Sequence, residues 1–298
     1  MIVVAGEALV DVIGRPGGAV VAVPGGGPFN TARAIGRLGL EVAWAGVLST
    51  DEHGQTMADA LAADGVSLAL VQRTTLPTTQ ALAELDDRGE ARYRFLVEGS
   101  SAPSLERGPL LAAARRLSAA DGLRAAHVGT LGLVWEPMAG AIEAFVDALP
   151  DDVLLVVDPN CRPSAIEEPD AYRTRMGRVL ARADVVKLSA ADLAYLGPIA
   201  GGRVRVVTDA ADPVRIEAGG RTQLVEVPPV EVVDTVGAGD TFGGAMLGWL
   251  VHAGTTRATL DEAAILAAVR FAVRASSLAC TRAGADPPTI AELGGWVA

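Results

Sequence analysis

Short runs of aliphatic residues alternate with helix-like stretches along this chain, and that alternation is the strongest constraint on its fold. Three of the runs are residues 153–158 (VLLVVD), 184–188 (DVVKL) and 204–208 (VRVVT). Nearly continuous apolar runs of this length are typical of strands buried on both faces of a parallel sheet. Segments 136–149 and 172–181 have the composition of helices. The pattern predicts a layered α/β fold with a mostly parallel sheet, in which ligands bind at the carboxyl ends of the strands.

Two hairpin-like stretches depart from this alternation. One is centred on Arg15-Pro16-Gly17-Gly18, and the other has the turn signal Asp87-Arg88-Gly89 between two partly alternating runs. We expect them to form a small sheet from about residues 10–23 and 80–98, inserted in a single domain that spans residues 1–298.

The predicted small sheet has an apolar face that so few strands cannot bury alone. The candidate residues of that face are Leu82, Leu85 and Phe95. A second subunit would cover them, so we expect a homodimer.

Charge and cysteine content narrow the class of protein. The chain has 25 Lys and Arg against 36 Asp and Glu, a net charge of −11. An acidic chain without a basic run is poorly suited to nucleic-acid backbones. Its two cysteines, Cys161 and Cys280, are too few for a disulfide framework and favour reduced thiols in the cytosol. No apolar run reaches the ~18 residues of a membrane helix, and the N-terminus lacks the basic segment of a signal peptide. We expect a cytoplasmic protein with neither nucleic-acid nor membrane partners.

The segment 234–244 (DTVGAGDTFGG) is the strongest chemical motif of the chain. It follows an extended stretch, 225–233, and precedes an apolar helix, 245–251. Glycines at a helix start let backbone N–H groups converge on an anion, where the helix dipole adds positive potential. On spacing alone two interpretations remain open: Asp240 lies beside a bound anion, or it merely caps the helix.

A second glycine-rich segment, residues 24–32 (PGGGPFNTA), opens a helix that ends near Gly39. Pro28 suits the first helical turn, and Asn30 projects from it. The segment either brings the backbone close to a polar ligand or is simply a flexible loop.

A P-loop is excluded because the only lysine, Lys187, lies in Val-Lys-Leu, and neither a dinucleotide-binding nor a protein-kinase signature is present.

Segments 25–39 (GGGPFNTARAIGRLG) and 234–244 resemble the two signatures of the ribokinase-like sugar kinases, the PfkB carbohydrate kinase family. The similarity covers nearly the whole chain and includes residues 6–11 (GEALVD) and 158–162 (DPNCR). It implies a ribokinase-like three-layer α/β/α sandwich with a mostly parallel central sheet and a small β-sheet lid. It also implies transfer of the γ-phosphate of ATP to a sugar hydroxyl. Glu7 and the 158–162 segment look most like fructokinases, so fructose or a related ketose or hexose is the expected substrate.

The resemblance assigns roles to residues of both segments. Asp240 matches the base that takes the proton from the attacking sugar hydroxyl. We expect a weak base there, because the helix dipole favours an ionised carboxylate. The amides of Gly237, Ala238 and Gly239 would form an anion hole for the transferring phosphoryl group. The other positions that match substrate-binding residues are Asp11, Gly26, Gly27, Asn30, Asn160 and Arg162.

The ATP side departs from the family pattern in two places. The family's Asn-x-x-Glu is Ser189-Ala190-Ala191-Asp192 here, which implies Mg²⁺ held through water by Asp192. The residues expected to contact the nucleotide are Ser189, Asp192, Thr208, Gly237 and Gly239. After Thr208 the usual glycine loop is replaced by residues 209–213 (DAADP), whose carboxylates would repel a triphosphate. The resemblance also implies a monovalent cation such as K⁺ near Asp234.

Other functions are compatible with parts of the sequence. A 2-keto-3-deoxygluconate kinase would carry an arginine shortly before a Gly-Ser-Ala-like stretch, but Leu96-Val97-Glu98 precede Gly99 here. A ribokinase or nucleoside kinase is a further alternative, disfavoured by an aromatic content of only 4%. The alternative outside the enzymes is a non-catalytic sugar-binding protein with the kinase fold.

Overall fold

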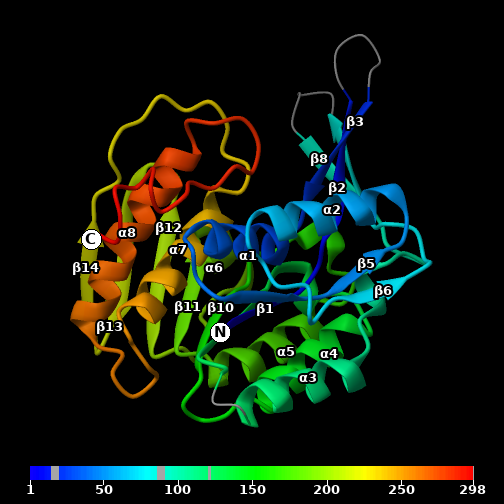
Figure 1. Cartoon of the computed structure of the whole chain (residues 1–298). Helices are drawn as coiled ribbons and strands as arrows, with labels where there is room; N and C mark the ends of the chain where they lie inside the picture. Colours follow the sequence, from blue (N-terminus) through cyan, green and yellow to red (C-terminus); the bar gives the residue numbers. More distant parts are fainter. Residues whose placement is uncertain (15–19, 86–90, 120–121, 298) are drawn as a thin grey trace.

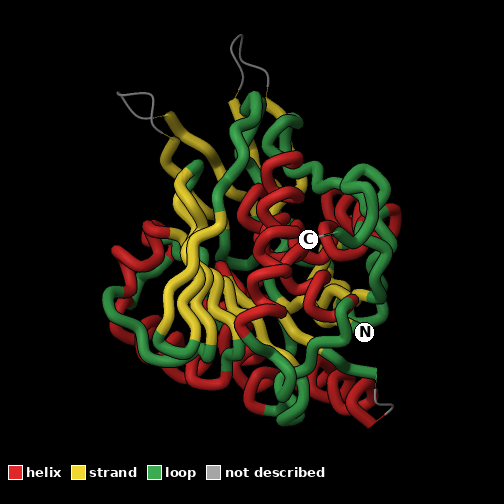
Figure 2. Tube along the Cα trace, turned by 90° about the vertical axis from the view of Figure 1, so that its left-hand side faces the viewer, coloured by secondary structure: helices red, strands yellow, loops and turns green. Residues whose placement is uncertain are grey.

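The computed structural model describes residues 1–14, 20–85, 91–119 and 122–297. Its central sheet has eight strands in the order β14-β13-β12-β11-β10-β9-β1-β4. They are β1 (Ile2–Ala5), β4 (Val42–Ala45), β9 (Ala125–Gly129), β10 (Leu154–Asp158), β11 (Val185–Ser189), β12 (Val204–Asp209), β13 (Asp212–Ala218) and β14 (Arg221–Val225). From β4 to β12 all neighbours are parallel, and only the pairs β12–β13 and β13–β14 are antiparallel. The predicted mostly parallel sheet is confirmed (Figures 1 and 2).

Helices cover both faces of this sheet. In β1, Ile2 and Val4 point into one buried cluster, whereas Val3 and Ala5 point into another. The first cluster packs against α1 (Gly27–Arg37), α2 (Glu52–Ala63), α7 (Ala238–His252) and α8 (Glu262–Ala279). The second packs against α3 (Arg107–Ala119), α4 (Met138–Asp147), α5 (Pro169–Arg182) and α6 (Ala190–Leu196). The result is the expected three-layer α/β/α sandwich (Figure 1).

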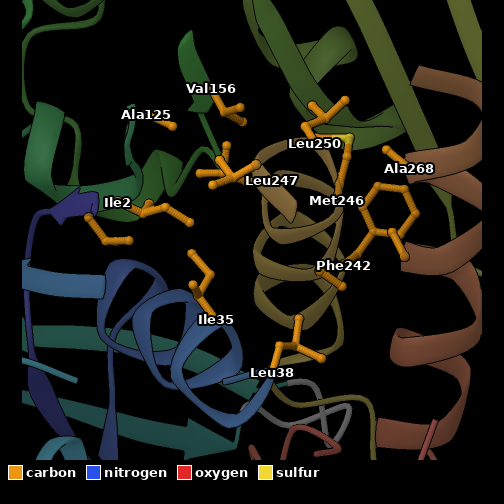
Figure 3. Close-up of a cluster of buried hydrophobic side chains, with 14 of the residues drawn as sticks. Ile2, Ile35, Leu38, Ala125, Val156, Phe242, Met246, Leu247, Leu250 and Ala268 are labelled. Carbon is orange, nitrogen blue, oxygen red and sulfur yellow. The ribbon is translucent and has the colours of Figure 1, made fainter. Parts of the chain in front are cut away.

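The packing of α7 explains one difference from the sequence prediction. The helix expected over residues 245–251 begins at Ala238, and residues 226–233 before it carry no regular secondary structure. A Cβ on Gly244 would lie 2.9 Å from the Thr31 carbonyl oxygen of α1. This glycine therefore belongs to a helix–helix contact rather than to a loop. Figure 3 shows Leu247 of α7 on the side of Ile2 and Ile35, and Met246 on the side of Ala268.

A separate four-stranded sheet has the order β3-β2-β7-β8 and projects beyond the helical layers (Figure 1). Its strands are β2 (Leu9–Gly14), β3 (Val20–Gly25), β7 (Gln80–Leu85) and β8 (Ala91–Leu96). The two predicted hairpin turns, at residues 15–18 and 87–89, lie outside the described residues. The remaining short elements are β5 (Val47–Ser49), β6 (Gln72–Thr74), η1 (Ala102–Ser104), η2 (Thr130–Leu133) and η3 (Pro163–Ala165).

The prediction that Leu82, Leu85 and Phe95 form one apolar face of the small sheet is wrong. Ala81 pairs with Phe95, and Leu82 pairs with Arg94. Because successive side chains alternate between faces, Leu82 and Phe95 lie on opposite faces of the sheet. The Leu85 side chain lies outside the described part of the structure.

Within the described ranges, no helix combines the length and apolar character needed to cross a bilayer.

Candidate active site

A cavity of about 270 Å³ opens between the starts of α1 and α7, at the carboxyl ends of β1, β9 and β10. Leu9, Asp11 and Phe95 of the small sheet form part of its wall. The structure brings together nine of the residues assigned from the sequence, although the first and last lie more than two hundred positions apart. They are Asp11, Gly26, Gly27, Asn30, Asn160, Arg162, Gly237, Gly239 and Asp240.

The centre of the site is a contact between the two helix starts. Asn30, in α1, donates from Nδ2 to Asp240 Oδ2 across 2.9 Å. Gly27 must lack a side chain, because a Cβ there would lie 2.5 Å from Thr130 Oγ1 and 3.3 Å from Asp240 Oδ1. Asp240 lines the cavity, although it is almost completely buried, with only 9% exposed.

The electrostatics of Asp240 correct one expectation. Burial raises the pKa of this carboxyl from 3.8 to about 6, and the nearby Asp158 adds to the rise. The Asn30 hydrogen bond and the cations Lys187 and Arg162 oppose it without cancelling it. The expected weak base is therefore wrong in direction, because desolvation outweighs the stabilisation of the ionised form at the helix start. A carboxyl with this pKa is well suited to take a proton near neutral pH.

The turn before α7 is built for close approach to a ligand. Gly237 is the N-cap residue with a φ of 74°, a left-handed conformation that favours glycine. Gly237 and Gly239 line the cavity. The Ala238 N–H instead donates to the Thr235 carbonyl oxygen at 3.2 Å. In this structure Ala238 thus closes the turn rather than presenting its amide to the cavity.

Asp11 and Arg162 line the cavity together. Burial raises the pKa of Asp11 to about 6, and the positive charge of Arg162 partly opposes this. Arg162 Nη1 donates to the Asn160 backbone oxygen and, across 2.7 Å, to Asn160 Oδ1. Asn160 Nδ2 approaches Thr130 Oγ1 at 3.5 Å. These contacts hold the loop after β10 against the end of β9.

Glu7 lines the cavity but was not among the site residues expected from the sequence. It is 1% exposed, and its two carboxyl oxygens accept from the backbone amides of Gly27, at 3.1 Å, and Gly132, at 2.8 Å. Burial raises the pKa of Glu7 to about 8. The available signal was an acidic residue two positions after a buried strand, but its two backbone partners are 20 and 125 residues away.

Of the residues assigned to ATP and Mg²⁺, Ser189, Asp192 and Thr208 lie outside the cavity lining. Asp192 Oδ2 accepts from the Ser189 backbone N–H at 2.7 Å and from the Ser189 hydroxyl at 2.6 Å. Its other oxygen accepts from the Cys161 N–H at 2.6 Å. Asp192 is 2% exposed. The Ser-x-x-Asp segment therefore works as a helix capping box that also anchors the loop carrying Arg162.

The acidic segment after Thr208 forms a tight hairpin between β12 and β13. Asp209 pairs with Asp212, both residues are exposed, and Ala210 has a φ of 43°. The Thr208 hydroxyl donates to the Leu188 carbonyl oxygen at 3.3 Å.

Asp234 ties the turn before α7 to the segment after α8. It accepts from the Val236 N–H at 3.0 Å and from the Gly284 N–H at 2.8 Å. These backbone hydrogen bonds, with that of Val236 the largest contribution, lower the pKa of Asp234. Its charge is thus retained close to Gly237.

Comparison with known proteins agrees with this geometry. Residues 1–291 match the pfkB family carbohydrate kinases. The chain is 33% identical over 265 residues to a fructokinase of Rhizobium leguminosarum bv. trifolii, covering 83% of this chain and 78% of that protein. A fructokinase of Xylella fastidiosa with bound ATP superposes with a TM-score of 0.88 at 29% identity, covering 98% and 96% of the two chains.

A fructokinase of Vibrio cholerae O395 with fructose, ADP and calcium bound has a TM-score of 0.84 at 25% identity, covering 100% of this chain and 98% of that one. A variant of that enzyme, with a TM-score of 0.83, holds fructose, ADP and a potassium ion. The fold and the cavity define a ribokinase-like sugar kinase. The chain belongs to the pfkB family of carbohydrate kinases, and within that family it is fructokinase-like.

Proposed function

We propose that this chain transfers the γ-phosphate of ATP to a hydroxyl of fructose. The observation that carries the proposal is the position of Asp240, which is hydrogen-bonded to Asn30 in the wall of the cavity and lies in the first turn of α7. The fructokinases of Xylella fastidiosa and Vibrio cholerae, with ATP or with fructose and ADP bound, support the choice of both substrates.

The reaction follows from the site. Asp240 accepts the proton of the sugar hydroxyl, the freed oxygen forms a bond to the γ-phosphorus, and the bond from that phosphorus to the leaving oxygen of ADP breaks. Positioning and charge stabilisation dominate such a transfer because its transition state is loose. The turn from Gly237 to Gly239, at a helix N-terminus, favours the negative charge of the phosphoryl group.

The sugar side of the site offers both kinds of hydrogen-bonding group. The Asp11 carboxylate can accept from a pair of hydroxyls, and the Asn30 amide can donate or accept. Asn30 Oδ1 is buried and has no hydrogen-bond partner among the described residues, so it is a free acceptor beside the base. We assign Gly26 and Gly27 to the close approach of the sugar, and Asn160 and Arg162 to the boundary between sugar and phosphates.

Mg²⁺ is the expected companion of ATP. The described residues contain no cluster of three or more His, Cys, Asp or Glu suited to a metal ion, so the phosphates would supply most of its ligands. The hydrogen bonds on both oxygens of Asp192 fit a contact through water rather than direct ligation.

We further propose a K⁺ site near Asp234, supported by its retained charge beside Gly237 and by the potassium in the Vibrio cholerae variant. Equal rates in K⁺ and in a bulky organic cation at matched ionic strength would contradict it.

The small sheet is proposed to act as a lid that excludes water from the phosphoryl group. Its residue Phe95 lines the cavity and packs edge-on against Trp135 with ring centroids 5.4 Å apart. Saturating fructose should slow hydrogen exchange in β7 and β8, and unchanged exchange there would reject closure.

A homodimer and a cytoplasmic location remain predictions. On the lid face opposite the cavity, Leu82 is half-buried and Leu96 is 41% exposed, which leaves apolar surface for a second subunit. Sedimentation velocity at micromolar concentration tests the dimer, because a single monomer-sized species would exclude it. The free thiols of Cys161 and Cys280 suit a reducing compartment.

A coupled assay for ADP release against fructose, other hexoses, ribose, 2-keto-3-deoxygluconate and nucleosides tests the proposed function. Fructose should give the highest kcat/KM. A clear preference for the keto-acid, or for ribose or a nucleoside, would replace fructose with that substrate class. Fructose binding by calorimetry without ADP release from any substrate would instead identify a non-catalytic sugar-binding protein.

A further inference from the structure

The only lysine of the chain lies behind the turn that begins α7. Lys187 is in β11, is 4% exposed and does not line the cavity. A Cβ on Gly239 would lie 3.0 Å from Lys187 Nζ. The ammonium group is therefore separated from the cavity by little more than the backbone of Gly239, and a side chain at position 239 would displace it.

Lys187 is held in this position by one buried carboxylate. Its Nζ donates to Asp158 Oδ2 across 2.8 Å, and both side chains are nearly inaccessible to solvent. The second oxygen, Asp158 Oδ1, has no hydrogen-bond partner among the described residues. Asp158 ends β10, directly before the loop that carries Asn160 and Arg162.

The surroundings keep Lys187 charged. Burial alone would lower the pKa of its ammonium, but Asp158 and the more distant Asp240 and Asp192 outweigh burial and raise it. His127, on β9, adds no charge, because burial and the nearby Lys187 lower its pKa to about 3. Burying a cation costs free energy unless the cation is paired. Packing alone therefore does not explain why Lys187 and its partner Asp158 occupy buried strand positions.

We propose that Lys187 is a positioning residue for phosphoryl transfer: its ammonium supplies positive charge behind the Gly237–Gly239 turn, and Asp158 holds it there. The proposal rests on the proposed function, since the charge it serves is that of the phosphoryl group. A buried charge acts more strongly than an exposed one because water does not screen it. The same charge helps to keep Asp240 ionised for proton transfer.

Opposite changes to the ion pair separate this role from a structural one. Lys187→Met removes the cation, whereas Asp158→Asn keeps it and removes the neighbouring negative charge. Asp240 faces Asn30 on α1, Asp158 on β10, Lys187 on β11 and Arg162 on the loop after β10, so both changes alter its electrostatic surroundings. Arg257→Met is the matched control, because it breaks the 2.9 Å ion pair with buried Asp184 at the other end of β11.

For Lys187→Met we expect kcat to fall by about 10²-fold, the typical cost of removing one group that stabilises transition-state charge. Fructose affinity by calorimetry should stay within about three-fold of wild type, and MgATP affinity should fall, because the cation acts on the phosphates and not on the sugar. The acid limb of kcat/KM should move to higher pH in Lys187→Met and to lower pH in Asp158→Asn. Arg257→Met should leave all four quantities unchanged.

Equal losses of kcat in Lys187→Met and Asp158→Asn, with unmoved acid limbs, would show that the pair is only structural and would overturn the proposal. If Lys187→Met does not fold, the double variant Lys187→Met/Asp158→Asn tests the proposal, because it replaces both charged groups by neutral ones. A near-wild-type kcat in the double variant would reject the role of the charge. A wild-type protein that phosphorylates no sugar would count against the proposed function. The MgATP affinities need no turnover and would still test Lys187.

Discussion

Asn30 and Asp240 are 210 residues apart in the sequence and form a 2.9 Å hydrogen bond that joins the first turns of α1 and α7. This contact places the base beside the glycine-rich segment that opens α1. It also stabilises the ionised carboxylate, against a burial that raises the pKa of Asp240. The site is thus assembled from two helix starts, each with a glycine-rich approach.

Removing the charge of Asp240 should stop phosphoryl transfer. Asp240→Asn keeps the shape of the side chain but cannot accept the hydroxyl proton, and loss of a general base typically costs ~10²–10⁴ in rate. Fructose affinity, measured by calorimetry, should stay within a few-fold. A variant that retains more than half of wild-type kcat would remove Asp240 from the mechanism.

Activity should decline on acidification below about pH 6. Asp240 must be ionised to accept a proton, and its pKa of about 6 places the acid limb of kcat/KM at that pH. Asp11 has a similar pKa, so Asp11→Asn is the necessary control. That variant should bind fructose more weakly yet keep the limb near pH 6. An acid limb that disappears in Asp11→Asn would assign the titration to Asp11.

Glu7 should make the protein less stable as pH rises from about 4.5 to about 8. Its pKa is 4.5 when exposed and about 8 in the folded state, so between these values the folded state binds the extra proton. The free energy of unfolding then falls by at most ~1.4 kcal/mol per pH unit from this group. Urea unfolding at pH 5, 6, 7 and 8 measures the slope.

Glu7→Gln should flatten this pH dependence. It should also raise the KM for fructose, because the glutamine side chain has one acceptor oxygen for the two amides of Gly27 and Gly132. A slope identical to wild type would show that Glu7 does not titrate in this range.

The acidic hairpin after β12 should weaken ATP binding. Asp209→Asn/Asp212→Asn removes two exposed negative charges and should lower the KM for ATP a few-fold, more at low ionic strength than at high, because salt screens exposed charges. Asp147→Asn/Asp152→Asn changes net charge equally at two other exposed carboxylates and should have no such effect. Equal shifts in both variants would indicate net charge alone.

Local sequence patterns were sufficient for three neighbouring strands of the central sheet. Residues 153–158, 184–188 and 204–208 were predicted as strands, and β10, β11 and β12 begin and end within one residue of those bounds. Continuous apolar runs are informative because a central strand is buried on both faces. The glycines of segment 234–244 are expected at a helix start, and α7 begins there; that Gly244 allows the close approach of α1 depends on the tertiary structure.

The sequence by itself determined the layered α/β fold and the two glycine-rich helix starts, because these depend on periodicity and on residue type at local spacing. Its resemblance to the ribokinase-like sugar kinases, and not local spacing, supplied the candidate base. Only the tertiary structure decided which groups face Asp240 and how deeply it is buried, and hence the direction of its pKa shift. It also decided that Glu7 joins two distant loops, that Leu82 and Phe95 face opposite ways, and that Lys187 lies behind Gly239. Such properties depend on distances between residues remote in the chain and on the exclusion of water, and neither is encoded at any single position.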